Sequence, residues 1–184
     1  MDIGQIRPGT NLIIEGEIYQ VVVYEHVKLA RGPAFCRAKM KSLKGDKLIE
    51  RTLRDSDDVK EAFIEKRKVQ FLYKDSSFYH FMDLLTYEGL RLDESSIFEI
   101  ALWLKENVEL EGLFHDGNLI NLGLPDVLEL KIIETEPGFR GDTVKQGTKP
   151  AKLETGATIQ VPLFLNNDTV IRVDPKTKQY LSKA

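Results

Sequence analysis

A strict two-residue alternation between Ala34 and Lys41 restricts what this part of the chain can become. Successive side chains of a β-strand point to opposite faces, whereas helical side chains recur every 3.6 residues. The segment is therefore predicted to be a half-buried strand with a basic outer face. The side chains expected to face the core are Ala34, Cys36, Ala38 and Met40. Those expected on the outer face are Phe35, Arg37, Lys39 and Lys41.

Short strand-like runs, rich in β-branched and aromatic residues and separated by turn signals, occupy most of the chain. They are predicted at 19–24, 47–53, 69–73, 78–82, 108–114, 119–124, 128–133, 158–161, 170–173 and 178–181. Asp116-Gly117 is a hairpin signal, and residues 136–152 are predicted to form a long loop. Ser96 and Glu99 fit a capping box that opens one short amphipathic helix.

The chain has 184 residues, a length that by itself suggests one large domain or two small ones. The number and spacing of the strands instead favour three small β-barrels. Breaks after Phe63 and Val127 give domains at 1–63, 64–127 and 128–184. Strands around a short helix in the middle part outline an oligonucleotide-binding (OB) barrel. Domains this small have marginal cores, so contacts between neighbours should contribute to stability.

Charge is distributed unevenly along a chain whose net charge is only −3. Between His26 and Arg54 there are nine basic and two acidic residues, whereas 64–127 holds six basic and twelve acidic residues. A basic stretch on an acidic protein is either a solvated strand face or an electrostatic footprint for nucleic acid. The acidic middle part should face away from phosphate.

Residue patterns for catalysis or metal binding are not found in this sequence. The three histidines stand far apart, and the lone Cys36 lies on the inward series of its strand, so a buried thiol is expected. Gly141 to Gly147 fails the phosphate-loop pattern, since five residues separate the glycines and Thr148-Lys149 follows. No enzymatic activity, cofactor or metal is predicted. One cysteine and the lack of a long apolar run indicate a reduced, cytoplasmic protein without a membrane partner.

Four stretches of this chain together resemble bacterial translation elongation factor P. The first runs from Glu25 to Lys28 and continues after the hairpin tip with Gly32, Ala34, Phe35 and Arg37. The others lie in 67–83, 134–143 and 149–164, and include Arg67-Lys68-Val69-Gln70-Phe71-Leu72-Tyr73, Glu134-Thr135-Glu136-Pro137-Gly138 and Lys149-Pro150-Ala151. The resemblance extends over essentially the whole sequence.

The resemblance implies a mostly β fold: a KOW (SH3-like) barrel followed by two OB-fold barrels in an elongated, L-shaped, tRNA-like arrangement. It also implies a cytoplasmic factor, expected to be a monomer, that binds both ribosomal subunits between the peptidyl-tRNA and exit sites. Such a factor contacts peptidyl-tRNA and promotes peptide-bond formation by the ribosome, notably at consecutive prolines. It has no active site of its own.

The functional residues that the resemblance implies gather at three places. Arg31, flanked by Lys28 and Gly32, takes the hairpin-tip position that reaches the acceptor end of the peptidyl-tRNA. A third-domain loop approaches mRNA near the exit-site codon, and a C-terminal tyrosine lies near the tRNA. These correspond to Gly141, Asp142, Thr143 and Lys145 for the loop and to Tyr180 for the tyrosine. Alternation and charge, independently of the resemblance, predict that Arg37, Lys39 and Lys41 contact the RNA backbone.

The tip departs from the family pattern, since Leu29 and Ala30 replace the usual Pro-Gly. A lysine-derived extension cannot form on Arg31. Rhamnosylated arginine members usually carry Asn where this chain has Gly32. Two states of Arg31 are therefore compatible with the sequence: unmodified, or altered by a tip-modifying enzyme. Asp168 stands where the family usually has Gly, and Asp tolerates a left-handed conformation better than most residues.

Three alternatives accompany this interpretation. The elongation factor P-like paralogue also has Ala-Arg-Gly at its tip, although Gly141-Asp142-Thr143 and Lys149-Pro150-Ala151 favour elongation factor P. A generic OB-fold RNA chaperone would bind single strands through exposed aromatics, but alternation assigns most of the middle-domain aromatics to the core. Those aromatics are Phe71, Tyr73, Phe78, Tyr79 and Phe81. A hydrolase built on the third-domain loop would need a metal or nucleophile that the sequence does not offer.

Overall fold

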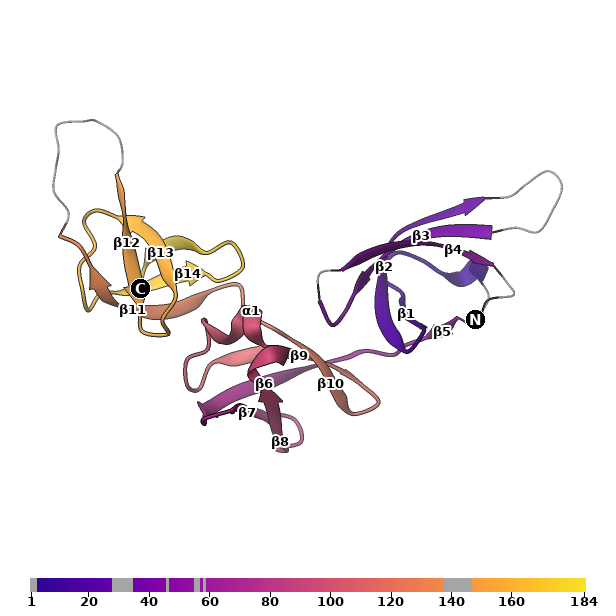
Figure 1. The fold of residues 1–184 in the computed structure, drawn as a ribbon, viewed down its shortest axis with the longest axis horizontal. Coiled ribbons are helices and arrows are strands. Elements are labelled where there is room, and N and C mark those ends of the chain that lie inside the picture. The colour runs from indigo at the N-terminus through magenta and orange to yellow at the C-terminus, as the bar shows by residue number, and fades with distance from the viewer. Residues whose placement is uncertain (1–2, 28–34, 46, 55–56, 58, 138–146) are drawn as a thin grey trace. The chain divides into compact units, whose positions relative to one another are not determined.

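The structure is a computed structural model that describes residues 3–27, 35–45, 47–54, 57, 59–137 and 147–184 (Figure 1). These residues are mostly β, as predicted. They form two five-stranded sheets and one closed five-stranded barrel. The chain separates into two compact units, Met1–Lys66 with Gly112–Asn121 and Arg67–Glu111 with Leu122–Ala184. The predicted domain boundaries after residues 63 and 127 stay predictions.

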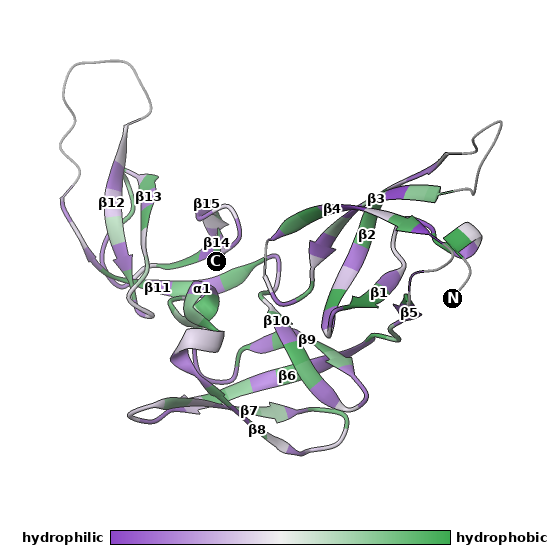
Figure 2. Ribbon diagram, turned by 45° about the vertical axis from the view of Figure 1, so that its right-hand side comes forward, coloured by the Kyte–Doolittle hydropathy of each residue, from purple (hydrophilic) through white to green (hydrophobic). Residues whose placement is uncertain are grey.

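The first sheet has the strand order β4-β3-β2-β1-β5. A short 3-10 helix, η1 (Ile3–Gln5), precedes β1 (Asn11–Ile14), β2 (Glu17–Val27), β3 (Phe35–Ser42), β4 (Leu48–Arg54) and β5 (Lys60–Glu61). The alternation predicted for β3 is confirmed, because Cys36, Ala38 and Met40 are buried. They pack in one core with Leu12, Val21 and Leu53. Figure 2 shows hydrophilic and hydrophobic residues following one another along β3.

Tight turns with positive φ join several strand pairs. Asp116 and Gly117 have φ of 48° and 77°, and Glu15 and Gly16 between β1 and β2 have φ of 54° and 81°. Two consecutive left-handed residues suit the twist of a two-residue hairpin. The hairpin predicted at Asp116-Gly117 is therefore confirmed.

The second sheet has the strand order β10-β9-β6-β7-β8. Its strands are β6 (Glu65–Lys74), β7 (Phe78–Asp83), β8 (Gly89–Asp93), β9 (Glu109–His115) and β10 (Asn118–Gly123). Phe71, Tyr79 and Phe81 are buried, as the alternation predicted. The register shifts between Phe71 and Tyr73, however, and Tyr73 is 50% exposed. A bulge that inserts a residue sends the next side chain to the opposite face.

The capping box predicted at Ser96 is wrong. The 3-10 helix η2 (Glu94–Ser96) is capped by Asp93, whose side chain accepts a hydrogen bond from the Ser96 N–H at 2.8 Å. The α-helix that follows, α1 (Phe98–Ala101), is a single turn, and its N-cap Ile97 makes no side-chain capping bond. Asp93 takes the capping position because its carboxylate is a stronger hydrogen-bond acceptor than the Ser96 hydroxyl. The Ser96 hydroxyl itself donates a hydrogen bond to Asp93.

The third sheet closes into a barrel with the order β11-β12-β13-β15-β14. Its strands are β11 (Leu128–Thr135), β12 (Thr148–Leu153), β13 (Thr158–Pro162), β14 (Val170–Asp174) and β15 (Gln179–Lys183). The long loop predicted for 136–152 is wrong at its end, because Thr148–Leu153 pairs with both β11 and β13. Asp168 has a φ of 64°, a left-handed conformation that Asp tolerates better than most residues, and its carboxylate lies 2.6 Å from Lys131 Nζ.

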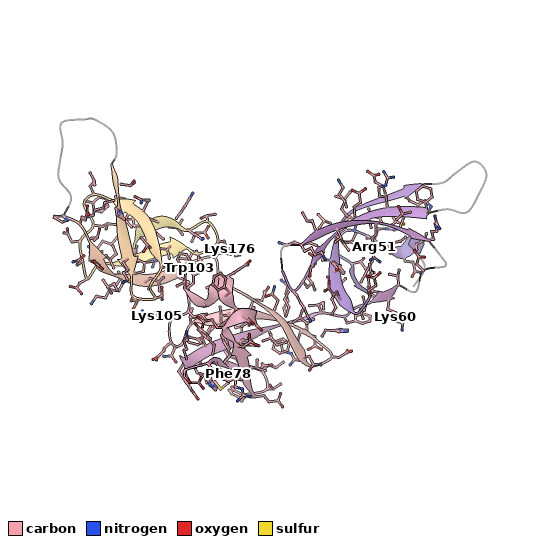
Figure 3. All side chains as sticks on the ribbon, viewed as in Figure 1. Arg51, Lys60, Phe78, Trp103, Lys105 and Lys176 are labelled. Atoms are coloured by element: carbon pink, nitrogen blue, oxygen red, sulfur yellow. The ribbon has the colours of Figure 1, made fainter. Side chains whose placement is uncertain are left out.

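One side chain from outside the third barrel completes its core. Trp103, which follows α1, is 4% exposed and packs with Leu128, Leu130 and Ile132 in the same buried cluster (Figure 3). An ion pair between Lys105 and Glu154, 2.9 Å apart, lies beside this contact. The segment after α1 and the third barrel therefore share one core, as expected if small barrels depend on their neighbours.

Candidate nucleic-acid interface

The basic face predicted on β3 is present. Arg37, Lys39 and Lys41 are exposed on the side of the strand opposite the core. The strand holds them there because it lies between β2 and β4, and ladders on both sides fix its register. Their side chains extend from a rigid scaffold at the two-residue spacing of a strand, which suits contacts along a phosphate backbone.

An acidic side chain on the neighbouring strand lowers the charge of this face. Glu50 on β4 lies opposite Lys39, and its carboxylate is 3.7 Å from Lys39 Nζ and 3.5 Å from Arg37 Nε. All three side chains are about half exposed, so water screens these pairs and each contributes little to stability. Counting charges along the sequence overlooks this neighbour, which comes from the next strand of the sheet.

The predicted tip residues Lys28, Arg31 and Gly32 lie outside the described residues. The strands that carry them are described: Val27 at the end of β2 pairs with Phe35 at the start of β3. Residues 28–34 therefore connect two antiparallel neighbours, which is the hairpin connection that the sequence predicts. One of these two strands, β3, carries the basic face, so the tip segment and that face belong to one hairpin.

The predicted loop residues Gly141, Asp142, Thr143 and Lys145 also lie outside the described residues, but the base of their loop does not. Lys149 on β12 is only 4% exposed, and its Nζ donates a hydrogen bond of 2.6 Å to the Glu136 carbonyl. The Thr135 hydroxyl donates to the Pro150 carbonyl at 2.8 Å. Side chains thus join the two strands from which the loop leaves. Sequence reasoning missed the buried Lys149, although it alternates with the inward-facing Ala151 and Leu153.

Tyr180, the predicted C-terminal contact, is half-buried on β15 and packs against the core of the third barrel. Part of its ring thus stabilises the barrel, and only the remainder is open to a partner.

The described residues contain no group of three or more His, Cys, Asp or Glu side chains placed to hold a metal ion. Cys36 is buried, as predicted. His80 Nε2 lies 2.7 Å from Asp75 Oδ2, so this histidine is held by a neighbouring turn. Within the described parts of the chain, no helix has the length and apolar character needed to cross a bilayer.

Three family models match consecutive parts of the chain. The elongation factor P KOW-like domain matches residues 2–59, the elongation factor P OB domain matches 64–122, and the elongation factor P C-terminal domain matches 128–183. Their order and type agree with the three small β domains expected from the strand pattern.

Full-length relatives carry the same name. The chain is 42% identical over 183 residues to elongation factor P of Caldicellulosiruptor saccharolyticus, covering 100% of this chain and 99% of the relative. It is 43% identical over 178 residues to that of Moorella thermoacetica, covering 97% and 96%. A solved translation initiation factor 5A from Methanococcus jannaschii, 25% identical, matches 67% of this chain and 93% of its own with a TM-score of 0.52. The chain therefore belongs to the elongation factor P family of translation elongation factors.

Proposed function

We propose that this protein binds the ribosome between the peptidyl-tRNA and exit sites in the cytoplasm and stimulates peptide-bond formation at stalled prolines. Family membership along the full chain carries this proposal. The exposed basic face of β3, on the same hairpin as Arg31, supports it, because that element combines phosphate-binding side chains with a terminal cation.

In this proposal the protein performs no bond chemistry. Proline is a poor, conformationally restricted substrate for peptide-bond formation. A cation that orders the acceptor end would lower the entropic part of the barrier. Arg37, Lys39 and Lys41 would hold the tRNA backbone, while the third-domain loop and Tyr180 would contact the RNA at the other end of the chain.

Relief of proline stalling is the direct test. In reconstituted translation, the protein should raise the rate of product formation from a message with consecutive prolines by about tenfold, equal to about 1.4 kcal/mol of barrier. A matched message with alanines at those codons serves as control and should respond little. Equal stimulation of both messages would contradict the proposal. Intact mass of natively expressed protein, measured alongside, reports whether Arg31 is modified.

Charge removal on the β3 face should weaken ribosome binding in a salt-dependent way. Changing Arg37, Lys39 and Lys41 together to Gln should flatten the slope of log affinity against log salt by about one for each phosphate that is no longer bound. Glu50→Gln should have the opposite effect, since it removes the acid between two of these cations. Lys68→Gln with Lys105→Gln and Arg172→Gln, which removes three exposed basic side chains elsewhere, is the matched control. An unchanged slope in the triple variant would exclude this face from RNA binding.

A further inference from the structure

The middle sheet has a second face that sequence reasoning did not identify. On β7, Tyr79, Phe81 and Asp83 point into the core, and Phe78, His80 and Met82 therefore lie on the opposite side. Tyr73 on β6 and Arg91 on β8 are the direct neighbours of His80 in the two adjacent ladders. Together these residues form what we call the outer aromatic face: Tyr73, Phe78, His80, Met82 and Arg91.

Two rings of this face are already stacked. The Tyr73 and His80 rings lie 4.5 Å apart between centroids, with an angle of 17° between their planes. The bulge between Phe71 and Tyr73 leaves Tyr73 half exposed, so part of its ring is open to solvent. Flat aromatic surfaces of this kind are platforms on which unpaired bases stack, with little dependence on base identity.

The orientation of the stack is fixed by the turn between β6 and β7. Asp75 accepts hydrogen bonds from the Ser77 and Phe78 N–H groups at 3.0 and 2.8 Å, and from His80 at 2.7 Å. The hydrogen bond from the Ser77 N–H has the largest effect on the Asp75 carboxyl, and together these contacts lower its pKa to about 2. The carboxylate nearest to the stack is therefore engaged by the turn itself and by His80.

Arg91 is the basic residue of the outer aromatic face, and its guanidinium is available to bind a phosphate. Its guanidinium lies 4.4 Å from the centroid of the Phe78 ring, and among the described residues it has no carboxylate partner. Other basic residues of the same domain are paired: Arg67 with Asp83, Lys68 with Glu109, Lys74 with Glu94 and Lys105 with Glu154. A guanidinium that is stacked but not paired can give a phosphate a bidentate contact.

We propose that the outer aromatic face binds a short single-stranded segment of nucleic acid, with a base on Tyr73 and a phosphate on Arg91. Strands β7 and β8 are the second and third strands of this OB domain, and that pair is the usual oligonucleotide-binding face of the fold. Strands β6 and β8 flank β7, so Tyr73 and Arg91 lie two strand spacings, about 10 Å, apart. The long Arg91 side chain can therefore meet the phosphate of a nucleotide whose base stacks on Tyr73. The site is separate from Arg31 and from the β3 face, and it does not depend on the proposed function.

Stacking should dominate this site, because the surrounding domain is acidic and Arg91 is the cation that the outer aromatic face offers to the phosphates. The affinity should consequently fall only slightly with salt, with a slope of about −0.7 for one phosphate contact with a single strand. A site built from a basic groove would show a slope several times steeper. The salt dependence therefore distinguishes the outer aromatic face from the β3 face.

The test is fluorescence anisotropy of a labelled single-stranded RNA of about 10 nucleotides, a length that suits one OB barrel. The protein is the full chain carrying Arg37→Gln, Lys39→Gln and Lys41→Gln, so that the β3 face contributes little. Tyr73→Ala and Arg91→Gln should each weaken binding about fivefold or more, and Tyr73→Phe should restore it. Tyr87→Ala is the matched control, since Tyr87 is an exposed tyrosine of the same domain outside this face.

Four results would overturn the proposal. They are a lack of RNA binding, equal losses for Tyr73→Ala and Tyr87→Ala, equal affinity for a double-stranded RNA of the same length, and a steep salt slope. Single-stranded DNA of the same sequence shows whether the 2′-hydroxyl contributes. If Tyr73→Ala leaves RNA binding intact but removes a cross-link to a ribosomal protein, the face is a protein-binding surface instead.

Discussion

Replacing Arg31 with alanine is expected to remove most of the stimulation of proline-stalled translation, a loss that approaches the full stimulation of about tenfold. This magnitude follows from the proposed role, because hydrogen bonds made by a charged group contribute about 1.5–3 kcal/mol and each 1.4 kcal/mol is about tenfold. The measurement is the rate of peptide-bond formation at the first stalled proline, at saturating protein. Affinity for the ribosome should change less, since Arg37, Lys39 and Lys41 are kept.

Two variants sharpen this experiment. Arg31→Lys keeps the charge but loses the planar fork, and it should retain part of the activity. Arg172→Ala removes an exposed arginine that pairs with Glu129 on the third barrel, and it should behave like the unaltered protein. Full activity of Arg31→Ala would show that the tip cation takes no part in the mechanism.

The largest loss of stability is expected for Trp103→Ala. The indole is almost fully buried in the core cluster of the third barrel, and truncation of a buried Trp costs about 3–5 kcal/mol through reduced transfer energy and the cavity left behind. Lys105 and Glu154 would remain but, as a partly exposed pair, would compensate little. Differential scanning calorimetry of the full chain should show the transition of the unit containing 122–184 moving to lower temperature.

The neighbouring residue provides the control. Leu102 is 56% exposed, and Leu102→Ala should change the free energy of unfolding by no more than about 0.5 kcal/mol. The transition of the unit that contains β1 to β5 should stay unchanged in both variants, because Trp103 is not part of its core. Equal effects of Trp103→Ala and Leu102→Ala would contradict the packing described above.

Features that depend on a residue and its near neighbours in sequence were predictable. The alternation of β3 indicated both its buried side and its basic side, because side-chain direction in a strand follows directly from position. The Asp116-Gly117 hairpin was predictable for a similar reason, since few residue pairs accept two positive φ angles.

Features that depend on pairing with a strand distant in sequence were not predictable. Nothing near Tyr73 in the sequence indicates the bulge that exposes it. Likewise, Glu50, which lowers the charge of the β3 face, comes from another strand. β12 was mistaken for loop because Lys149, Pro150 and Ala151 are poor strand formers in isolation. Pairing with β11 on one side and β13 on the other makes this segment a strand. The two-residue spacing of Phe78 and His80 places both on the same side of one strand. The residues that complete the outer aromatic face come from β6 and β8, which this spacing does not reveal.

Trp103 gives this chain a built-in optical reporter. It is the one tryptophan in the sequence, and it sits where the segment after α1 meets the third barrel. Its emission therefore depends on the hydration of that single junction, while the unit with the first sheet contributes no indole signal. Denaturant titrations followed by tryptophan fluorescence and by circular dichroism would thus report one part and the whole separately, without a label.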